Sequence, residues 1–235
     1  MNSKVSKDFS GLPSFKIVLH GPSGIGKTTV LRLLTSIKKV EDPPKLASAL
    51  SSISSPSGST IFFDKVSFLA GDFGLEKEKG VKIHVWATAG GKKHHKQRKI
   101  TLEGVEGIVL MLSPVPSELE DNRCSIEEIS SFANELPLQI MINKSDLVSK
   151  DVLEHSLSEI DEMVNSYDLN SIKPPIITSA SVAAKELISL LQSPEIKQCL
   201  TDEGKIKREC RPKSIDQLAS PIRIVTEEII KKISP

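Results

Sequence analysis

The sequence has no marked excess of charge of either sign and no long apolar run. Its 235 residues include 31 Lys and Arg and 30 Asp and Glu, so the formal net charge is +1. A chain that binds nucleic acid usually carries a strong basic excess, so we expect no nucleic-acid partner. A transmembrane helix needs about 18 consecutive apolar residues, and because no such run occurs we expect no transmembrane span.

Cysteines and membrane-targeting signals are also scarce. The three cysteines, Cys124, Cys199 and Cys210, are odd in number and fit no metal-binding or redox spacing. Residues 1–13 are polar, without the apolar core of a signal peptide and without the glycine that myristoylation requires. The chain ends in Ile-Ser-Pro, which offers no cysteine for prenylation. Together these absences favour a protein of the reducing cytoplasm.

What the sequence does contain is a glycine-rich turn between an apolar run and an amphipathic segment. Gly21 is followed by four residues and then by Gly26-Lys27-Thr28, which is the spacing of a loop that wraps a polyphosphate. The alternative is a glycine turn that matches this motif by chance. The motif requires a strand before it and a helix after it, and both are expected here, so that backbone N–H groups and a helix dipole would face one anion.

The glycine-rich turn therefore predicts a phosphate-binding site. In it, Lys27 would reach the β and γ phosphates, and the hydroxyl of Thr28 would bind Mg²⁺. The residues expected to contact phosphate are Ser23, Gly24, Ile25, Gly26, Lys27, Thr28 and Thr29.

Strand-like runs recur along the chain. Residues 61–68 and 81–86 read as an antiparallel hairpin, and the apolar runs at 107–112, 138–142 and 175–178 read as buried strands. Helices are expected between them, at about 125–134 with Ser125 and Glu128 as a capping box, at about 151–164 capped by Asp151 and Glu154, and at about 182–191. This alternation predicts an α/β fold with a doubly wound, mostly parallel sheet, helices on both faces and one antiparallel edge hairpin.

Residues 40–59 interrupt that alternation. They are rich in Ser and Pro and read as a long irregular loop. Loops of this length are usually functional or disordered.

A second informative stretch, Asn143-Lys144-Ser145-Asp146, follows the expected strand at 138–142 directly. A carboxylate at this end of the sheet can accept parallel hydrogen bonds from N1–H and the exocyclic amine of guanine, a donor pair that adenine lacks. A base that left this carboxylate without hydrogen-bond donors, as adenine would, binds much more weakly. Asp146 would therefore set guanine specificity. The alternative is a polar turn that ends the strand.

Taken together, these stretches resemble the Ras-like small GTPases over residues 15–191. The resemblance implies a P-loop G domain that binds GTP or GDP with Mg²⁺ as cofactor. The resemblance implies that Asn143, Lys144 and Ser179 bind the nucleotide and that the backbone amide of Ala180 contacts the guanine oxygen. In that family the counterparts of Thr60 and Gly90 hold the γ-phosphate, with Thr60 also a Mg²⁺ ligand beside Thr28.

Within the family, the chain most resembles the MglA-type prokaryotic polarity GTPases. Thr60-Ile-Phe-Phe-Asp64 is similar to their Thr-Leu-Phe-Phe-Asp. A preceding Pro-Pro-x-Leu stretch, and Arg-Lys followed by Gly-Val-x-Gly between Arg98 and Gly107, also fit. A role in polarity or motility would follow only from this resemblance, since a fold does not fix a biological role.

Two departures bear on catalysis. Where most small GTPases have Asp-x-x-Gly-Gln, this chain has Ala87-Thr88-Ala89-Gly90-Gly91, and Gly91 has no side chain to orient the attacking water. Ser59 stands where MglA-type proteins tend to carry an arginine. We therefore expect Lys27, Thr60 and Gly90 to support only slow GTP hydrolysis, unless His94, His95, Gln97 or a partner completes the site.

The expected domain organisation has three parts: a flexible N-terminus at 1–14, the G domain at 15–193 and a C-terminal extension at 194–235. The extension contains an amphipathic helix at 221–233. This helix either packs on the sheet as the final helix of the G domain or serves a partner.

Two functions stay open from the sequence. The first is a switch that hydrolyses GTP and works through protein effectors, activating proteins and exchange factors. The second is a GTP-binding module that presents an effector surface without hydrolysis, which Gly91 favours. The basic run at 92–99 leaves a peripheral membrane contact possible, although a solvated helical face explains it equally well. An ATP-dependent nucleotide kinase is disfavoured by Asp146, because it would need no guanine loop.

Overall fold

The structure is a computed structural model that describes residues 12–53, 64–78, 80–89, 95–133 and 135–233. At its centre is a six-stranded sheet with the order β2-β3-β1-β4-β5-β6. Strand β2 pairs with β3 in antiparallel fashion, and the other pairs of this sheet are parallel. The predicted fold class, including the edge hairpin, is therefore confirmed. The strands are β1 (Ser14–His20), β2 (Asp64–Leu69), β3 (Lys82–Ala87), β4 (Gly107–Leu112), β5 (Leu138–Ile142) and β6 (Ile176–Ile177).

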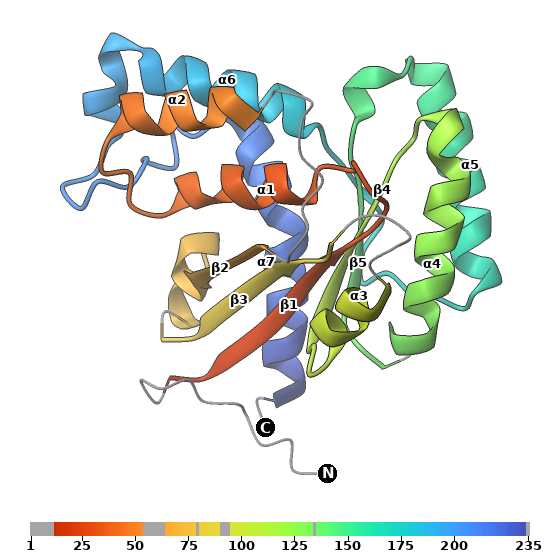
Figure 1. The fold of residues 1–235 in the computed structure, drawn as a ribbon. Helices are drawn as coiled ribbons and strands as arrows, with labels where there is room; N and C mark the ends of the chain where they lie inside the picture. Colours follow the sequence, from red (N-terminus) through yellow and green to blue (C-terminus); the bar gives the residue numbers. More distant parts are fainter. Residues whose placement is uncertain (1–11, 54–63, 79, 90–94, 134, 234–235) are drawn as a thin grey trace.

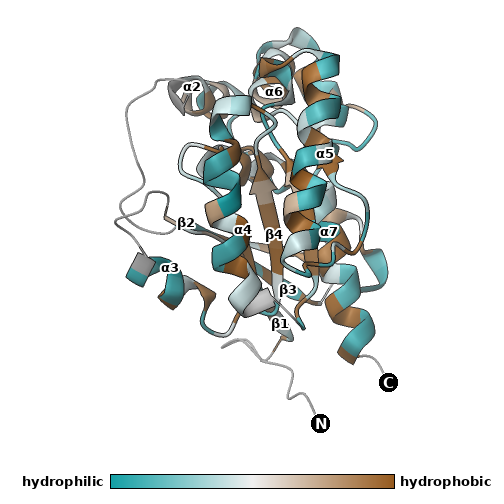
Figure 2. Ribbon diagram, turned by 90° about the vertical axis from the view of Figure 1, so that its right-hand side faces the viewer, coloured by the Kyte–Doolittle hydropathy of each residue, from teal (hydrophilic) through white to brown (hydrophobic). Residues whose placement is uncertain are grey.

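Helices cover both faces of the sheet (Figure 1). Strand β4 shows why: Met111 belongs to one apolar core with Val225, whereas its neighbour Leu110 belongs to a second core with Ile126 on the opposite face. Figure 2 shows β4 as an apolar strand among helices whose outer surfaces are polar. The first core is covered by α1 (Lys27–Leu34), α2 (Pro43–Ile53), α6 (Ala180–Gln192) and α7 (Lys213–Ile233), and the second by α4 (Leu119–Ala133) and α5 (Lys150–Ser166).

The expectation of an irregular loop at 40–59 is wrong for its first part, because α2 occupies Pro43–Ile53. Asp42 caps this helix: its Oδ1 accepts a hydrogen bond from Lys45 N at 3.0 Å. Proline is compatible with the first turn of a helix, where its missing N–H has no partner anyway, so Pro43 starts α2 rather than breaking it. Ala47 and Leu50 are buried, and α2 packs against α6.

Two predicted helix starts are also wrong. Helix α4 begins at Leu119, so Ser125 is not a cap; its Oγ donates to the carbonyl of Asp121 at 3.0 Å inside the helix. In α5 the cap is Ser149, whose Oγ accepts from Val152 N, rather than Asp151. In each helix, a Ser or Asp inside the helix is followed three residues later by Glu. It therefore matched the capping pattern although the helix begins earlier in the chain.

The C-terminal helix α7 packs against the sheet and is longer than expected, since it continues through the buried Pro221. Its Ile222, Val225 and Ile229 belong to the same core as β1 and α1. Gly107 of β4 lets the helix approach closely, because a Cβ at that position would overlap Val225 Cγ1.

Between α6 and α7 the chain forms a loop that a disulfide closes. Cys199 is bonded to Cys210, so the expectation of cysteines without a redox pairing is wrong, and Cys124 is exposed and free. Spacing alone did not reveal the bond because it depends on how the loop folds back on itself. Among the described residues, no helix is both long enough and apolar enough to cross a membrane.

Candidate functional site

The predicted phosphate loop joins the end of β1 to the start of α1. Gly26 caps α1 with a φ of 100°, in the left-handed region that suits glycine. A Cβ at Gly26 would lie 2.8 Å from Nδ2 of Asn143, and one at Gly21 would overlap the carbonyl oxygen of Met111. Glycine at these positions therefore lets the loop lie against the ends of β4 and β5.

Lys27 is folded back onto the loop. Its Nζ donates to the carbonyl oxygens of Gly21 and Pro22, each at 2.7 Å, and the residue is only 6 % exposed. The pKa of Lys27 is lowered to about 7, mainly by burial and also by the nearby charge of Arg98, while Glu128 acts in the opposite direction. A bound phosphate would replace the two carbonyls as the partner of this amine.

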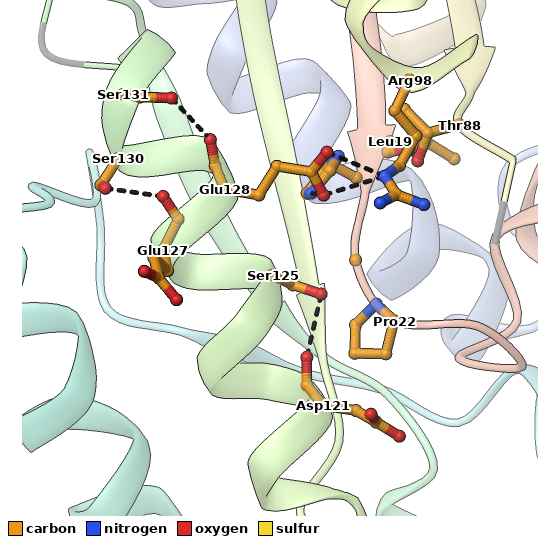
Figure 3. Close-up of polar contacts among 12 residues, drawn as sticks. Leu19, Pro22, Thr88, Arg98, Asp121, Ser125, Glu127, Glu128, Ser130 and Ser131 are labelled. Atoms are coloured by element: carbon orange, nitrogen blue, oxygen red, sulfur yellow. Dashed lines mark hydrogen bonds and ion pairs between the residues drawn. The ribbon is translucent and has the colours of Figure 1, made fainter. Parts of the chain in front are cut away.

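Next to Lys27 lies a pair of opposite charges carried by two helices. Arg98 belongs to α3 (His95–Leu102), and Glu128 of α4 reaches toward its guanidinium (Figure 3). Arg98 Nε lies 2.9 Å from both Glu128 carboxylate oxygens. The buried ring of His20 lies 3.6 Å from Glu128; desolvation, then the charges of Lys27 and Arg98, lower the pKa of His20 to about 3, so it is neutral near pH 7.

Thr28, the predicted Mg²⁺ ligand, contacts an aspartate that was not among the predicted site residues. Its Oγ1 donates to Oδ2 of Asp64 at 2.7 Å. Asp64 begins β2 and pairs on the neighbouring strand with Ala87, the first residue of the predicted second-switch stretch. The signal for Asp64 was its place at the end of the Thr60-Ile-Phe-Phe-Asp64 match.

The oxygen atoms of Thr28 and Asp64 fit Mg²⁺, a hard cation that is usually held by one or two protein oxygens together with water and substrate phosphates. The described residues contain no group of three or more His, Cys, Asp or Glu side chains that would form an all-protein metal site. The second predicted ligand, Thr60, lies outside the described residues.

Asn143 joins the two sequence-predicted loops to each other. Its Nδ2 donates to the carbonyl of Ile25 at 2.7 Å, and its Oδ1 accepts from Ala180 N at 2.9 Å. Asn143 is 2 % exposed and holds the phosphate loop against the start of α6 through these two hydrogen bonds. The Ala180 amide, expected to meet guanine, is bonded to Asn143 in this structure.

Two further predicted residues, Asp146 and Lys144, lie in the loop after β5, where the sequence predicts that guanine binds. Asp146 accepts a hydrogen bond from Ser179 Oγ at 2.5 Å, and this contact connects the loop after β5 to the start of α6. Lys144 has a φ of 68°, and its Nζ lies 2.7 Å from Oε1 of Glu118, a partner that the sequence did not indicate. The carboxylate of Asp146 is thus held beside Ser179 at the edge of the site.

One cavity of about 370 Å³ brings the two loops together. The predicted residues that line it are Gly24, Ile25, Gly26, Thr29, Asn143, Lys144, Asp146 and Ala180. Leu50 of α2 and Ile188 of α6 add an apolar wall, and Leu50 was missed because residues 40–59 read as a loop. Volumes of this order suit a small-molecule ligand.

Several predicted residues do not line this cavity. Lys27 and Thr28 turn toward Gly21 and Asp64 respectively, and Ser23 is exposed on the loop. Ser59, Gly90, Gly91 and His94 lie, like Thr60, outside the described residues, so their predicted roles stay predictions.

Comparison with known proteins returned relatives along most of the chain. The Ras-related protein RabF1 of Dictyostelium discoideum is 29% identical over 167 residues, covering 70% of this chain and 75% of that protein. The mutual gliding-motility protein MglA of Myxococcus xanthus is 30% identical over 139 residues, covering 56% of this chain and 68% of that protein. The GTP-binding protein ypt1 of Schizosaccharomyces pombe is 27% identical over 186 residues, covering 78% and 80%. No protein-family model matches the chain.

Proposed function

Because the chain belongs to the Ras-like small GTPases, we propose that it is a molecular switch that binds GTP and GDP and hydrolyses GTP slowly. The observation that carries this proposal is the shared cavity of the two loops. Gly26 and Asp146 are 120 residues apart in sequence, yet both line it. Phosphate-loop backbone on one side and a carboxylate on the other match the two ends of a guanine nucleotide.

In this proposal each described residue has a stated task. Lys27 leaves the carbonyls of Gly21 and Pro22 and neutralises phosphate charge, and Asp146 accepts hydrogen bonds from guanine while Ser179 holds it in place. Thr28 and Asp64 would hold Mg²⁺, which supplies positive charge to the phosphates when bound. Thr60 and Gly90 are proposed to hold the γ-phosphate, as in the family.

Slow hydrolysis is proposed because Gly91 has no side chain to position water. The same observation supports a second candidate, a GTP-binding module that never hydrolyses its ligand. Under either function, the partners would be effectors together with exchange or activating proteins.

We propose that the protein is located in the cytoplasm, because a GTP-binding switch needs a supply of guanine nucleotides. The disulfide between Cys199 and Cys210 is the observation that speaks against it, because such bonds are rare in reducing compartments. We also propose that α7 is the final helix of the G domain, since it packs on the sheet.

Base specificity is tested by titrating nucleotide-free protein with fluorescent GDP and ADP in the presence of Mg²⁺. We expect GDP to bind, ADP to bind at least about 100-fold more weakly, and Asp146→Asn to weaken GDP by a similar factor. The matched control is Asp202→Asn, an exposed position outside the site, which should leave both affinities unchanged. Equal affinity for ADP and GDP would contradict the proposed guanine site.

Hydrolysis is tested by single-turnover assays with GTP. If Gly91→Gln hydrolyses GTP faster than the unmodified protein, the chain is a switch that lacks only the water-positioning group. If the unmodified protein is fast and Gly91→Gln changes nothing, another residue positions the water. The absence of hydrolysis from both proteins would favour the non-hydrolysing module.

A further inference from the structure

A second and larger cavity, of about 740 Å³, lies apart from the nucleotide loops. Three segments line it: the turn that follows β2, including η2 (Ala70–Phe73), the loop closed by the Cys199–Cys210 disulfide, and the first half of α7. None of the sequence-predicted phosphate or guanine residues lines this cavity.

The walls of this cavity are held in place by contacts between distant parts of the chain. Lys205, in the disulfide loop, lies 2.8 Å from Oδ1 of Asp72, whose side chain is almost fully buried. The adjacent Gly204 accepts a hydrogen bond from Val40 N at 2.8 Å. Because Val40 stands between α1 and α2, the disulfide loop is fixed to the body of the domain at two points.

Positively charged side chains outnumber negatively charged ones in the lining of this cavity. Its lining includes six Lys and Arg against four Asp and Glu, in a chain whose net charge is only +1. Internal ion pairs use Lys205 with Asp72 and Arg211 with Asp216. In the part of the chain that the structure describes, Lys207, Arg208 and Lys213 have no carboxylate partner.

Two arginines that line this cavity also have N–H groups without a hydrogen-bond acceptor among the described residues. The Nε atoms of Arg211 and Arg223 are buried and have no hydrogen-bond acceptor among the described residues; Arg223 Nε lies 3.8 Å from Glu227, beyond hydrogen-bond length. Buried donors are normally satisfied, so each such group needs an explanation. Phe73 and Ile206 give the cavity an apolar part beside these cations.

We propose that this cavity binds a small organic anion that bears two or more phosphate groups. Guanidinium forks match phosphate oxygens bidentately, and the unpaired Lys207, Arg208 and Lys213 supply the positive charge that a multivalent anion needs. The cavity volume is in the range of small-molecule sites, and its apolar part accommodates the carbon skeleton of the ligand. The ligand is either a soluble phosphate compound or the headgroup of a phosphorylated lipid.

The test is calorimetric titration of the full chain with inorganic pyrophosphate, with GDP and Mg²⁺ present to occupy the phosphate loop. We expect one site per chain, weakened at least about tenfold by Arg208→Ser combined with Lys213→Ser, since each lost charged contact is worth roughly that factor. Both side chains are exposed, so the variant should fold. The matched control is Arg123→Ser combined with Lys150→Ser, on α4 and α5, which should bind pyrophosphate unchanged.

The outcomes separate this site from the nucleotide site. Pyrophosphate bound at the phosphate loop is displaced by GDP and is insensitive to the Arg208 and Lys213 substitutions, whereas the proposed site behaves in the opposite way. Failure of GDP to bind would contradict the proposed function but leave this test valid. The proposal would be overturned if pyrophosphate showed no saturable binding, or if it bound equally well to the variant that combines Arg208→Ser with Lys213→Ser, here called the pocket variant. Sedimentation with phosphatidylcholine vesicles that contain a phosphoinositide distinguishes the two kinds of ligand. If the unmodified protein binds these vesicles and the pocket variant does not, the ligand is a lipid headgroup. If the unmodified protein does not bind the vesicles, the ligand is a soluble phosphate compound.

Discussion

The Nε atom of Arg98 on α3 lies 2.9 Å from both carboxylate oxygens of Glu128 on α4. Both side chains are largely buried, at 12% and 15% exposure, and both charges act on Lys27 of the phosphate loop. The pair therefore attaches α3 to α4 beside the amine that would hold phosphate. Its two members are not equivalent, because Glu128 stabilises the charge of Lys27 and Arg98 opposes it.

This asymmetry predicts unequal losses of stability. Glu128→Gln leaves two cations facing each other and should lower the free energy of unfolding by about 3–5 kcal/mol, whereas Arg98→Met should cost about 1–2 kcal/mol. Urea denaturation of the nucleotide-free protein measures both. The control is Arg123→Met, which removes the exposed pair with Glu120 and should change stability by less than about 1 kcal/mol. Equal losses for the two buried variants would show that Lys27 does not sense the pair.

The lowered pKa of Lys27, about 7, predicts that nucleotide binding takes up a proton at alkaline pH. Bound phosphates favour the charged amine and raise its pKa. Below about pH 7 the free protein already carries the proton, so GDP affinity should be nearly independent of this group. Above it the amine is neutral before binding, and affinity should fall by up to about tenfold per pH unit.

Calorimetry in two buffers with different ionisation enthalpies measures the uptake directly. We expect it to rise from near zero at about pH 6 toward one proton at about pH 9. Arg98→Met should shift this rise to higher pH, because removal of a neighbouring cation raises the pKa of Lys27. Proton uptake that stays near zero across this range would contradict the folded-back amine.

The contact between Thr28 and Asp64 predicts that Mg²⁺ binding depends on an aspartate of β2. Asp64→Asn keeps a hydrogen-bond acceptor for Thr28 but loses the charge, so the fold should persist while Mg²⁺ affinity falls by about 10- to 100-fold. The measurement is the GDP dissociation rate with Mg²⁺ and with excess EDTA. The two rates should converge in Asp64→Asn and stay different in Ser67→Ala, a control on the same strand. A variant with unchanged Mg²⁺ dependence would remove Asp64 from the site.

The sequence predicted the sheet and the phosphate loop because both depend on local patterns. Continuous apolar runs identified β4 and β5, and the glycine spacing located the turn before α1. Asp146 was predicted in the same way, because the stretch Asn143–Asp146 directly follows the buried strand β5.

The missed features depend on contacts that the linear pattern does not contain. Helix α2 was hidden because Pro43 resembles a helix breaker, although proline suits the first turn of a helix, where Asp42 caps α2. Asp64 joined the site through its distance to Thr28, 36 residues earlier in the chain. The bond between Cys199 and Cys210 required the loop to fold back on itself through the bridge between Leu200 and Ile206.

That disulfide joins two cysteines that are 11 residues apart in the sequence, and it should stabilise the domain. Cys199→Ser is expected to lower the free energy of unfolding by about 2–3 kcal/mol, because the unfolded chain gains conformations. Hydrogen exchange at the Val40 amide should quicken, since its acceptor is Gly204 in the same loop. The control is Cys124→Ser, at the exposed free cysteine, which should change neither property. If Cys199→Ser matches the unmodified protein, the bond does not form in solution.

The close approach of α7 to β4 predicts a cost for any side chain at Gly107. A methyl group there would overlap Val225 Cγ1 and lie 3.0 Å from Ile229 Cδ1, so α7 would have to shift. Gly107→Ala should therefore lower the free energy of unfolding by about 1–3 kcal/mol, as overpacking does. Combining it with Val225→Ala should restore part of that loss relative to the sum of the single changes, because the second substitution removes the overlapping methyl groups.

Gly80→Ala is the matched control for the α7 contact, since a Cβ at Gly80 meets nothing within 4 Å and its backbone is not left-handed. Its stability should stay within about 0.5 kcal/mol of the unmodified protein. Urea denaturation followed by far-UV circular dichroism compares five proteins: the unmodified chain, the three single variants and the double variant. If Gly107→Ala is as stable as Gly80→Ala, α7 does not lie on β4 as described, and its place as the last helix of the domain is wrong. If it is destabilised and rescued by Val225→Ala, the helix is part of the same folding unit as the sheet that carries the phosphate loop.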